Sequence, residues 1–168
     1  MKLDKKKEFL ERIDTNQDII HKICNLYADR PEDHTDLGQE IVYQLWKSYK
    51  SFKGQSKFTT WMYKVALNTA LLNLRRDRLK KKTQTLKEYH ASVPDRAGAS
   101  EKIQDIGKLY ACINQLHKFD RAIVLLYLEE FSYQEIADIT GISTKNVSVR
   151  LVRVKKKLKD LFWSGTED

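Results

Sequence analysis

Apolar residues recur every three to four positions along most of the chain, which is the spacing of one face of an α-helix. In the first half this pattern predicts helices over about 5–28, 33–49 and 58–82. In the second half it predicts helices over about 103–116, 120–130, 133–140 and 144–160. We expect a cap or kink near Asp14–Thr15, and Arg30-Pro31 marks a break, because the residue before a proline disfavours helix.

Two of the predicted helices show a recognisable buried side. In the helix over 33–49 the apolar residues at near-helical spacing are Leu37, Ile41, Leu45 and Tyr49. In the helix over 58–82 the expected buried residues are Trp61, Val65, Leu72 and Leu79. Both helices are therefore expected to contribute to a core.

The periodic pattern fails between Thr83 and Ser100. This segment contains Pro94, Gly98 and several small or polar residues, which is typical of a flexible linker. The predicted fold class is all-α, with two small helical domains at 1–82 and 102–168 and a linker at 83–101.

The charge balance narrows the choice of partner. The 168 residues carry a formal net charge of +8, which favours a polyanion: nucleic acid or an anionic membrane surface. No stretch reaches the roughly 18 apolar residues of a membrane span, and Met1–Lys7 has no signal-peptide character. We therefore expect a cytoplasmic protein without membrane insertion, in which Cys24 and Cys112 are reduced core residues.

The C-terminal domain has the signals of a helix-turn-helix. Ser132-Tyr133-Gln134-Glu135 fits a capping box at the beginning of a short helix that ends at Thr140-Gly141. Glycine permits the left-handed turn that follows, and Ser143 can cap a second helix. A short helix, a glycine turn and a second capped helix predict a DNA-binding helix pair.

The second helix of this pair has one apolar and one basic side. Val147, Leu151, Val154 and Leu158 form one stripe, and every charge from Lys145 to Lys159 is positive. We expect Arg153 to pair with a guanine edge, and Val149 or Val152 to contact a thymine methyl. Arg150 and the lysines are better placed for phosphates. The candidate duplex contacts are Lys145, Asn146, Ser148, Val149, Arg150, Val152, Arg153 and Lys156.

The N-terminal domain combines aromatic and basic residues around one predicted loop, 51–57, and the helix after it. Aromatic faces can stack on unpaired bases while lysines hold the backbone, although Phe52, Phe58 and Trp61 are equally compatible with a core role. Amides and arginines continue along the helix. The candidate contacts to unpaired DNA are Phe52, Lys53, Ser56, Lys57, Trp61, Tyr63, Lys64, Asn68, Asn73, Arg75 and Arg76.

Three blocks of the chain together resemble one family. They are Asp36–Trp46 (DLGQEIVYQLW), Phe52–Ala70 and Ser132–Arg153, in that order and with the linker between the second and third. These blocks are similar to the sigma-70 family of bacterial RNA polymerase sigma factors, and specifically to its short two-domain members of the extracytoplasmic-function (ECF) type. The chain departs from the family pattern at Gly38, where some helix propensity of the docking helix is lost, and at Ser148 and Val149, which leave the upstream sequence preference open.

The resemblance implies a mechanism without a catalytic site, metal or cofactor. It implies docking on core RNA polymerase through Asp36, Leu37, Gln39, Glu40, Gln44 and Trp46. It further implies minus-ten recognition and melting by the N-terminal domain, minus-thirty-five recognition by the C-terminal helix pair, and a linker threaded toward the polymerase active site. Small members of the family are commonly held inactive by an anti-sigma protein.

Three alternatives compete with this interpretation. A stand-alone helix-turn-helix repressor or activator would explain the C-terminal domain but not the aromatic-lysine loop. A nucleic-acid enzyme would need clustered ligands or bases, whereas His21, His34, His90 and His117 are scattered. A membrane-surface helix over 145–159 would compete for the apolar stripe that the helix pair requires.

Overall fold

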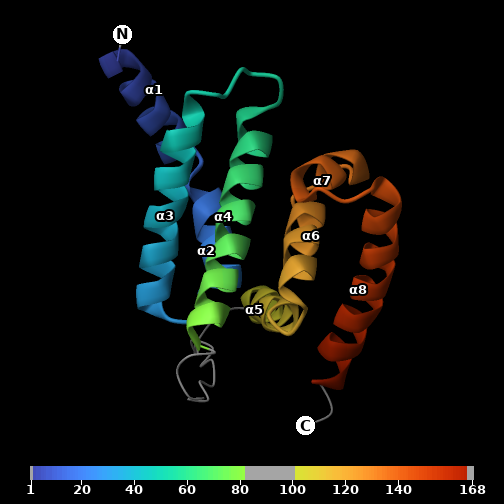
Figure 1. Cartoon of the computed structure of the whole chain (residues 1–168). Coiled ribbons are helices and arrows are strands. Elements are labelled where there is room, and N and C mark those ends of the chain that lie inside the picture. The colour runs from blue at the N-terminus through green and yellow to red at the C-terminus, as the bar shows by residue number, and fades with distance from the viewer. Residues whose placement is uncertain (1, 82–100, 166–168) are drawn as a thin grey trace. The chain divides into compact units, whose positions relative to one another are not determined.

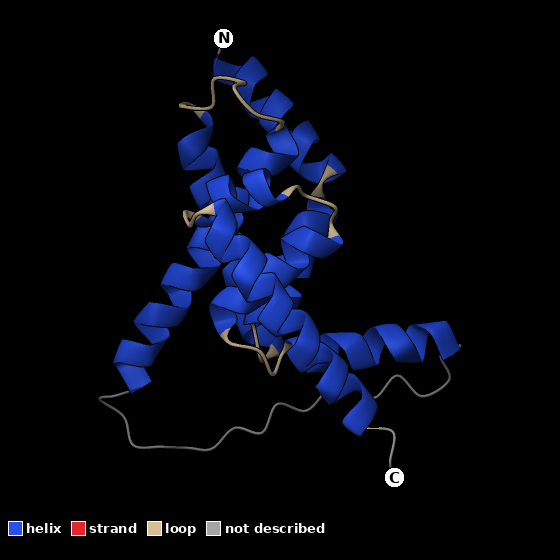
Figure 2. Ribbon diagram, turned by 90° about the vertical axis from the view of Figure 1, so that its right-hand side faces the viewer, coloured by secondary structure: helices blue, strands red, loops and turns tan. Residues whose placement is uncertain are grey.

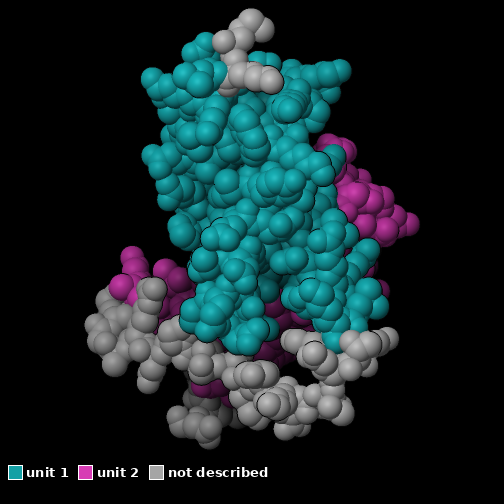
Figure 3. All heavy atoms as spheres, turned by 60° about the vertical axis from the view of Figure 1, so that its left-hand side comes forward, with its two compact units in different colours: residues 1–88 teal, residues 89–168 magenta. Residues whose placement is uncertain are grey.

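Helices account for all regular secondary structure in the part of the chain that the structure, a computed structural model, describes: residues 2–81 and 101–165 (Figures 1 and 2). The chain divides into two units, residues 1–88 and 89–168, which Figure 3 distinguishes by colour. The all-α prediction is confirmed. The predicted linker 83–100 lies outside the described residues.

Unit 1 contains α1 (Lys2–Thr15), α2 (Gln17–Tyr27), α3 (Pro31–Tyr49) and α4 (Phe58–Lys81). The interruption expected near Asp14–Thr15 is confirmed at the next residue, Asn16, whose side chain donates to the Arg12 carbonyl at 2.8 Å. Pro31 occupies the first position of α3, where its fixed φ suits the helix and its missing N–H costs nothing. Helix α3 therefore begins two residues earlier than predicted.

The core of unit 1 lies between α2, α3 and α4, and Figure 1 shows α3 and α4 side by side. Its fully buried side chains are Ile23, Cys24, Ile41, Leu45, Met62, Ala66 and Ala70. The small side chains of Ala66 and Ala70 let α4 approach its neighbours closely. The buried face of α3 was predicted correctly at Leu37, Ile41 and Leu45.

The predicted buried face of α4 is wrong. Leu72 is 52% exposed and Leu79 is 68% exposed, while Trp61 and Val65 are half-buried. The buried face instead contains Met62, Tyr63, Ala66, Leu67, Thr69 and Ala70. The first four turns of α4 are apolar on most sides, so periodicity alone did not identify the side that packs.

Unit 2 contains α5 (Glu101–Ile113), α6 (Lys118–Leu128), α7 (Tyr133–Thr140) and α8 (Thr144–Ser164). Helix α8 contacts the other three, and three residues of its predicted stripe, Val147, Leu151 and Val154, are buried, while the fourth, Leu158, is half-buried. It continues four residues beyond the predicted end, where Phe162 is half-buried and the Lys108 Nζ atom lies 4.6 Å from its ring centroid. This contact with α5 supports the last turn of α8.

The helix-turn-helix is confirmed. The Ser132 hydroxyl accepts from the Glu135 amide at 3.2 Å, and the Glu135 carboxylate accepts from the Ser132 amide at 2.8 Å. Gly141 ends α7 with φ 76°, a left-handed conformation that glycine adopts without strain. The Ser143 hydroxyl then accepts from the Asn146 amide at 3.1 Å and caps α8.

Candidate nucleic-acid interface

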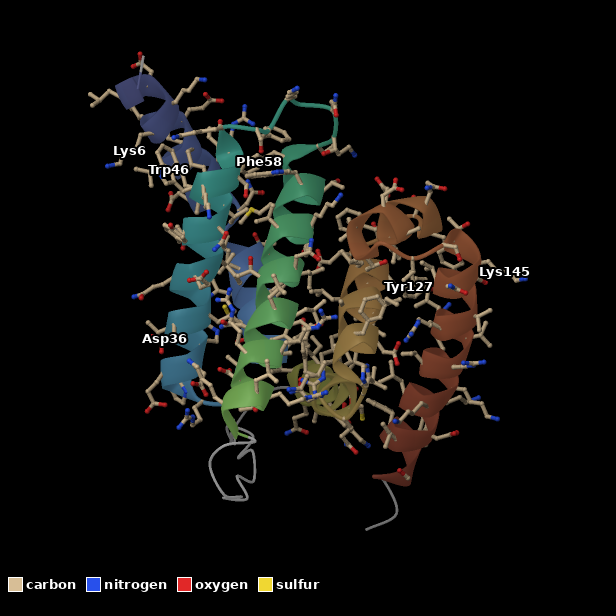
Figure 4. All side chains as sticks on the ribbon, viewed as in Figure 1. Lys6, Asp36, Trp46, Phe58, Tyr127 and Lys145 are labelled. Carbon is tan, nitrogen blue, oxygen red and sulfur yellow. The ribbon has the colours of Figure 1, made fainter. Side chains whose placement is uncertain are left out.

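The outward face of α8 combines positive charge with small apolar side chains. Val149 and Val152 are 41% and 68% exposed, Arg153 and Lys156 are exposed, and Ser148 is half-buried. Lys145 extends away from the first turn of α8 in Figure 4. Cations beside methyl-bearing side chains are the chemistry that duplex recognition uses: charge for phosphates and apolar contact for thymine methyls.

One basic residue of α8 packs against a neighbouring helix of unit 2. The Lys155 Nζ atom lies 4.1 Å from the Tyr127 ring centroid on α6. A side-chain hydrogen bond with Tyr127 raises the pKa of Lys155 above its ordinary value. Lys155 therefore remains fully charged at neutral pH while it covers the α6 surface.

Arg150, which the sequence predicted to contact a phosphate, binds two residues of α6 in this structure. Its Nη1 atom donates to the Asp120 Oδ1 atom at 2.7 Å, and its guanidinium lies 5.0 Å from the Phe119 ring centroid. Both partners belong to the first turn of α6. In this conformation the Arg150 side chain joins two helices of unit 2.

The loop between α3 and α4 presents mainly polar groups to solvent. Lys53, Gln55, Ser56 and Lys57 are exposed, and Gly54 takes φ 69° in the turn between them. Phe52, Phe58 and Trp61 are half-buried and pack against one another, with Phe52 and Trp61 ring centroids 5.0 Å apart. The sequence left open a core role for these three aromatic residues, and their partial burial supports that role in part.

Helix α1 supports this aromatic cluster, a role that the sequence analysis missed. The Phe9 ring centroid lies 5.1 Å from those of both Trp46 and Tyr49, and Phe9 is 2% exposed. The Arg12 guanidinium lies 5.2 Å from the Phe58 ring centroid. The available signal was the i, i+4 spacing of Phe9 and Ile13, both buried.

The exposed side of α4 lies directly after the loop. Lys64, Asn68, Leu72, Arg75 and Arg76 are exposed at spacings of three to four residues, so they share one face, while Asn73 beside them is half-buried. The expectation that Tyr63 contacts DNA is corrected, because Tyr63 is 2% exposed and belongs to the core. The exposed face of α4 therefore presents the amide of Asn68 between Lys64 on one side and Arg75 and Arg76 on the other.

A groove of about 930 Å³ lies between α1, α2 and α3. Phe9 and Leu10 of α1 line it opposite Gln39, Tyr43 and Trp46 of α3. Leu10 and Tyr43 are 51% and 57% exposed, so the groove presents apolar surface to solvent. Gly38 also lines the groove, and a Cβ atom at this position would lie 3.8 Å from the Sγ atom of the buried Cys24.

Two of the residues implied in polymerase docking, Gln39 and Trp46, line this groove, and the other four lie elsewhere on α3. Asp36 and Gln39 are exposed, whereas Glu40 and Gln44 are half-buried and joined by a hydrogen bond of 2.8 Å from the Gln44 amide to the Glu40 carboxylate. Asp36 and Trp46 mark opposite ends of α3 in Figure 4. Leu37 is 4% exposed and is corrected from a contact residue to a core residue.

Two further observations concern other kinds of site. Among residues 2–81 and 101–165, no three His, Cys, Asp or Glu side chains lie close enough together to hold a metal ion, and His90 falls outside these ranges. Within the same ranges, no helix has the length and apolar character to cross a bilayer. Cys24 and Cys112 are buried free thiols, and burial raises the pKa of Cys24 to about 11.

The helix-turn-helix and the two exposed basic faces define a helical, DNA-binding class of protein. Residues 12–80 match the family model Sigma-70 region 2, and residues 106–158 match Sigma-70, region 4. The RNA polymerase sigma factor YlaC of Bacillus subtilis (strain 168) is 30% identical, with 82% of each chain covered. The ECF RNA polymerase sigma factor SigW of the same organism is 27% identical, covering 91% of this chain and 90% of the relative.

The chain belongs to the sigma-70 family of RNA polymerase sigma factors, and the names of its relatives place it in the ECF subfamily. It acts in bacterial transcription initiation as a non-enzymatic factor, which excludes the alternatives of a stand-alone repressor or activator and of an enzyme acting on nucleic acid. The sigma factor RpoE, solved in complex with the anti-sigma factor NepR from Bartonella quintana, shares the fold. That comparison has a TM-score of 0.74 at 18% identity and covers 96% of this chain and 99% of that one.

Proposed function

We propose that unit 1 docks on core RNA polymerase and captures unpaired minus-ten bases, while unit 2 binds the minus-thirty-five element as duplex. In domain terms, residues 1–82 act as region 2, 83–101 as the linker and 102–168 as region 4. The observation that carries the proposal is the capped helix-turn-helix whose second helix is apolar on one side and basic on the other. A protein with these partners works in the cytoplasm.

The test of the whole proposal is run-off transcription with purified core polymerase and a promoter library. We expect the chain to associate with core polymerase and to direct initiation from a subset of promoters that share two short elements. Neither free core polymerase nor the chain alone should start from these sites. A chain that does not bind core polymerase, or does not change the start site, contradicts the proposal.

Melting follows from capture of bases rather than from hydrolysis of a nucleotide. Unstacking a base costs a few kcal/mol, and an exposed amide between cations can offset part of this cost by hydrogen bonding and phosphate contact. Asn68, flanked by Lys64 and Arg75 on the exposed face of α4, has this arrangement. The exposed loop residues Lys53, Ser56 and Lys57 extend the basic surface beyond the beginning of α4.

The groove between α1 and α3 is the proposed centre of polymerase docking. It contains Gln39 and Trp46 from the implied docking set, and its exposed apolar lining needs a partner to cover it. Acidic Asp36 and Glu40 lie on the same helix and add charge that can select a basic partner surface.

We expect Trp46→Ala and Glu40→Lys to weaken binding of core polymerase, because the first removes apolar contact area in the groove and the second reverses an acidic charge of the docking set on α3. Lys47→Ala is the matched control, since Lys47 is exposed on α3 but does not line the groove. The measurement is a titration of core polymerase by fluorescence anisotropy, with circular dichroism to verify folding. Normal binding by both variants would remove the docking assignment.

We also propose an anti-sigma partner for this chain, supported by the solved complex of RpoE with the anti-sigma factor NepR. The apolar groove is available to such a partner only when polymerase is absent. Competition between a purified candidate and core polymerase for the chain would test this.

A further inference from the structure

Two contacts join the recognition helix α8 to the first turn of α6. The Arg150 Nη1 atom donates to the Asp120 Oδ1 atom at 2.7 Å. The Arg150 guanidinium lies 5.0 Å from the Phe119 ring centroid. The partners are 30 residues apart in sequence, so only the folded unit brings them together.

The ion pair is partly shielded from water. The Asp120 side chain is 20% exposed and the Arg150 side chain is 42% exposed. Arg150 precedes Leu151, one of the buried residues of α8, and lies between that stripe and the outward residues Val149 and Arg153. A contact at this edge of the helix resists rotation of α8 about its own axis.

The α6 side of the contact is itself held in place. The His117 Nδ1 atom accepts from the Phe119 amide at 3.4 Å, and the Arg121 Nε atom donates to the Leu116 carbonyl at 3.1 Å. Behind this turn, Ala122 and Ile123 are 1% and 0% exposed. Asp120 therefore extends from a rigid support rather than from a loop.

The chemistry of the contact requires arginine. A planar guanidinium can donate to a carboxylate while its face lies over an aromatic ring, whereas a lysine ammonium does not reproduce both contacts. Asp120 neutralises the positive charge of Arg150. The pair therefore adds little to the positive charge of α8, whose other ionised side chains from Lys145 to Lys159 are also cations. Phosphate binding would require Arg150 to leave two existing partners.

We propose that Asp120 and Phe119 hold Arg150 as a positioning residue, which sets the rotation of α8 in the upstream duplex. Discrimination of the minus-thirty-five element then depends on two α6 side chains that do not contact bases. This inference rests on the proposed function, because it assumes that α8 binds the upstream element.

The two possible roles of Arg150 predict opposite results for Asp120→Asn. This change removes one negative charge, so the formal net charge rises from +8 to +9. If Arg150 contacts a phosphate, releasing it from Asp120 leaves DNA affinity unchanged or increases it. If Arg150 positions α8, recognition of the upstream element becomes weaker even though the protein is more positive.

The experiment uses the chain bound to core polymerase and promoter fragments whose upstream element is intact or scrambled. The discrimination ratio is the affinity for the intact fragment divided by that for the scrambled one. We expect Asp120→Asn and Arg150→Lys each to lower this ratio about tenfold, the size of coupling between residues in direct contact. The double variant Asp120→Asn/Arg150→Lys should lose no more than either single variant, and Asp120→Glu should retain most of the ratio.

Two controls separate positioning from charge and from folding. Asp160→Asn makes the same change in net charge at an exposed position of α8 and should leave the ratio unchanged. The dependence of affinity on salt should keep its wild-type slope in Arg150→Lys and Arg150→Gln, since no phosphate contact is lost. Thermal unfolding of each variant verifies that unit 2 is folded at the assay temperature.

A discrimination ratio that is unchanged or higher in Asp120→Asn would overturn the inference. So would a salt slope in Arg150→Gln that falls by about one, the signature of a lost phosphate contact. A wild-type complex that does not distinguish intact from scrambled upstream elements would instead refute the proposed function itself.

Discussion

Glu130 shows how one residue determines a connection between helices. Its amide donates to the Tyr127 carbonyl at 3.0 Å, and the Phe131 amide donates to the Leu126 carbonyl at 3.1 Å. This pair of bonds is the Schellman motif, in which the residue after the helix cap takes a left-handed conformation. Glu130 does so with φ 62°, which is strained for any residue with a Cβ atom.

We therefore expect Glu130→Gly to increase the free energy of unfolding of unit 2 by about 1 kcal/mol, because glycine removes the steric cost of the left-handed conformation. Glu129→Gly is the matched control: Glu129 has φ −83°, so glycine there relieves no strain, adds freedom to the unfolded chain and should lower stability. Chemical denaturation followed by circular dichroism measures both. An unchanged or lower stability of Glu130→Gly would show that the strain is relieved in solution.

At the scale of elements, α1 depends on the rest of unit 1 for its stability. Its 14 residues are near the length at which an isolated helix is marginal in water, and most of them are polar. Phe9 and Ile13 attach it to the unit, and Phe9 contacts both Trp46 and Tyr49. The same helix thus lines the proposed docking groove and packs beside the aromatic cluster at the loop.

Substitutions at the adjacent residues Phe9 and Leu10 of α1 should separate its structural role from its proposed role in polymerase binding. Phe9→Ala is expected to destabilise unit 1 by about 3–5 kcal/mol, because a buried aromatic leaves a cavity. It should also reduce amide protection in the loop 51–57. Leu10→Ala, at a position that is 51% exposed, should change stability little but weaken binding of core polymerase. Hydrogen exchange and polymerase titration measure the two effects, and equal destabilisation by both variants would contradict the assignment.

At the scale of the whole molecule, the chain consists of two units with separate cores. The proposed contacts follow this division, with Asn68 in unit 1 and Arg153 in unit 2. Mutations in separate, independently packed sites usually combine additively. This property provides a test of the division of labour between the units.

Arg153→Ala should weaken binding of a promoter with its upstream element by about 1–3 kcal/mol, the contribution of a side chain that pairs with a base edge. Asn68→Ala should weaken binding of promoters with unpaired minus-ten bases, and the two losses should add within about 0.5 kcal/mol. Affinities of the polymerase complex for fork-junction DNA give all three values. An excess loss above about 1 kcal/mol in the double variant would show that the sites are coupled.

Local signals in the sequence were sufficient for the elements and for the helix-turn-helix. The capping box at Ser132 and the glycine at 141 act within four residues of their partners, so they are visible in the sequence itself. The buried stripe of α8 was also predictable, because basic residues occupy its other sides. These features depend on neighbours along one helix.

Features that depend on residues distant in sequence were not predictable. Helix α4 is apolar on several sides, so only its packing against α2 and α3 determined that Tyr63 is buried and Leu72 is exposed. Arg150 looked like any other cation of α8 until the fold placed Asp120 beside it. The packing of Phe9 against Trp46 and Tyr49 likewise connects residues about 40 positions apart.

The sequence by itself thus determined the all-helical class, the helix-turn-helix, the positive charge and the family resemblance, because each of these is encoded in residues close together along the chain. Tertiary structure alone decided which side of α4 is exposed, which cation of α8 is neutralised and where the groove between α1, α2 and α3 lies. The physical reason is that burial and ion pairing depend on neighbours in space, and only folding determines those neighbours.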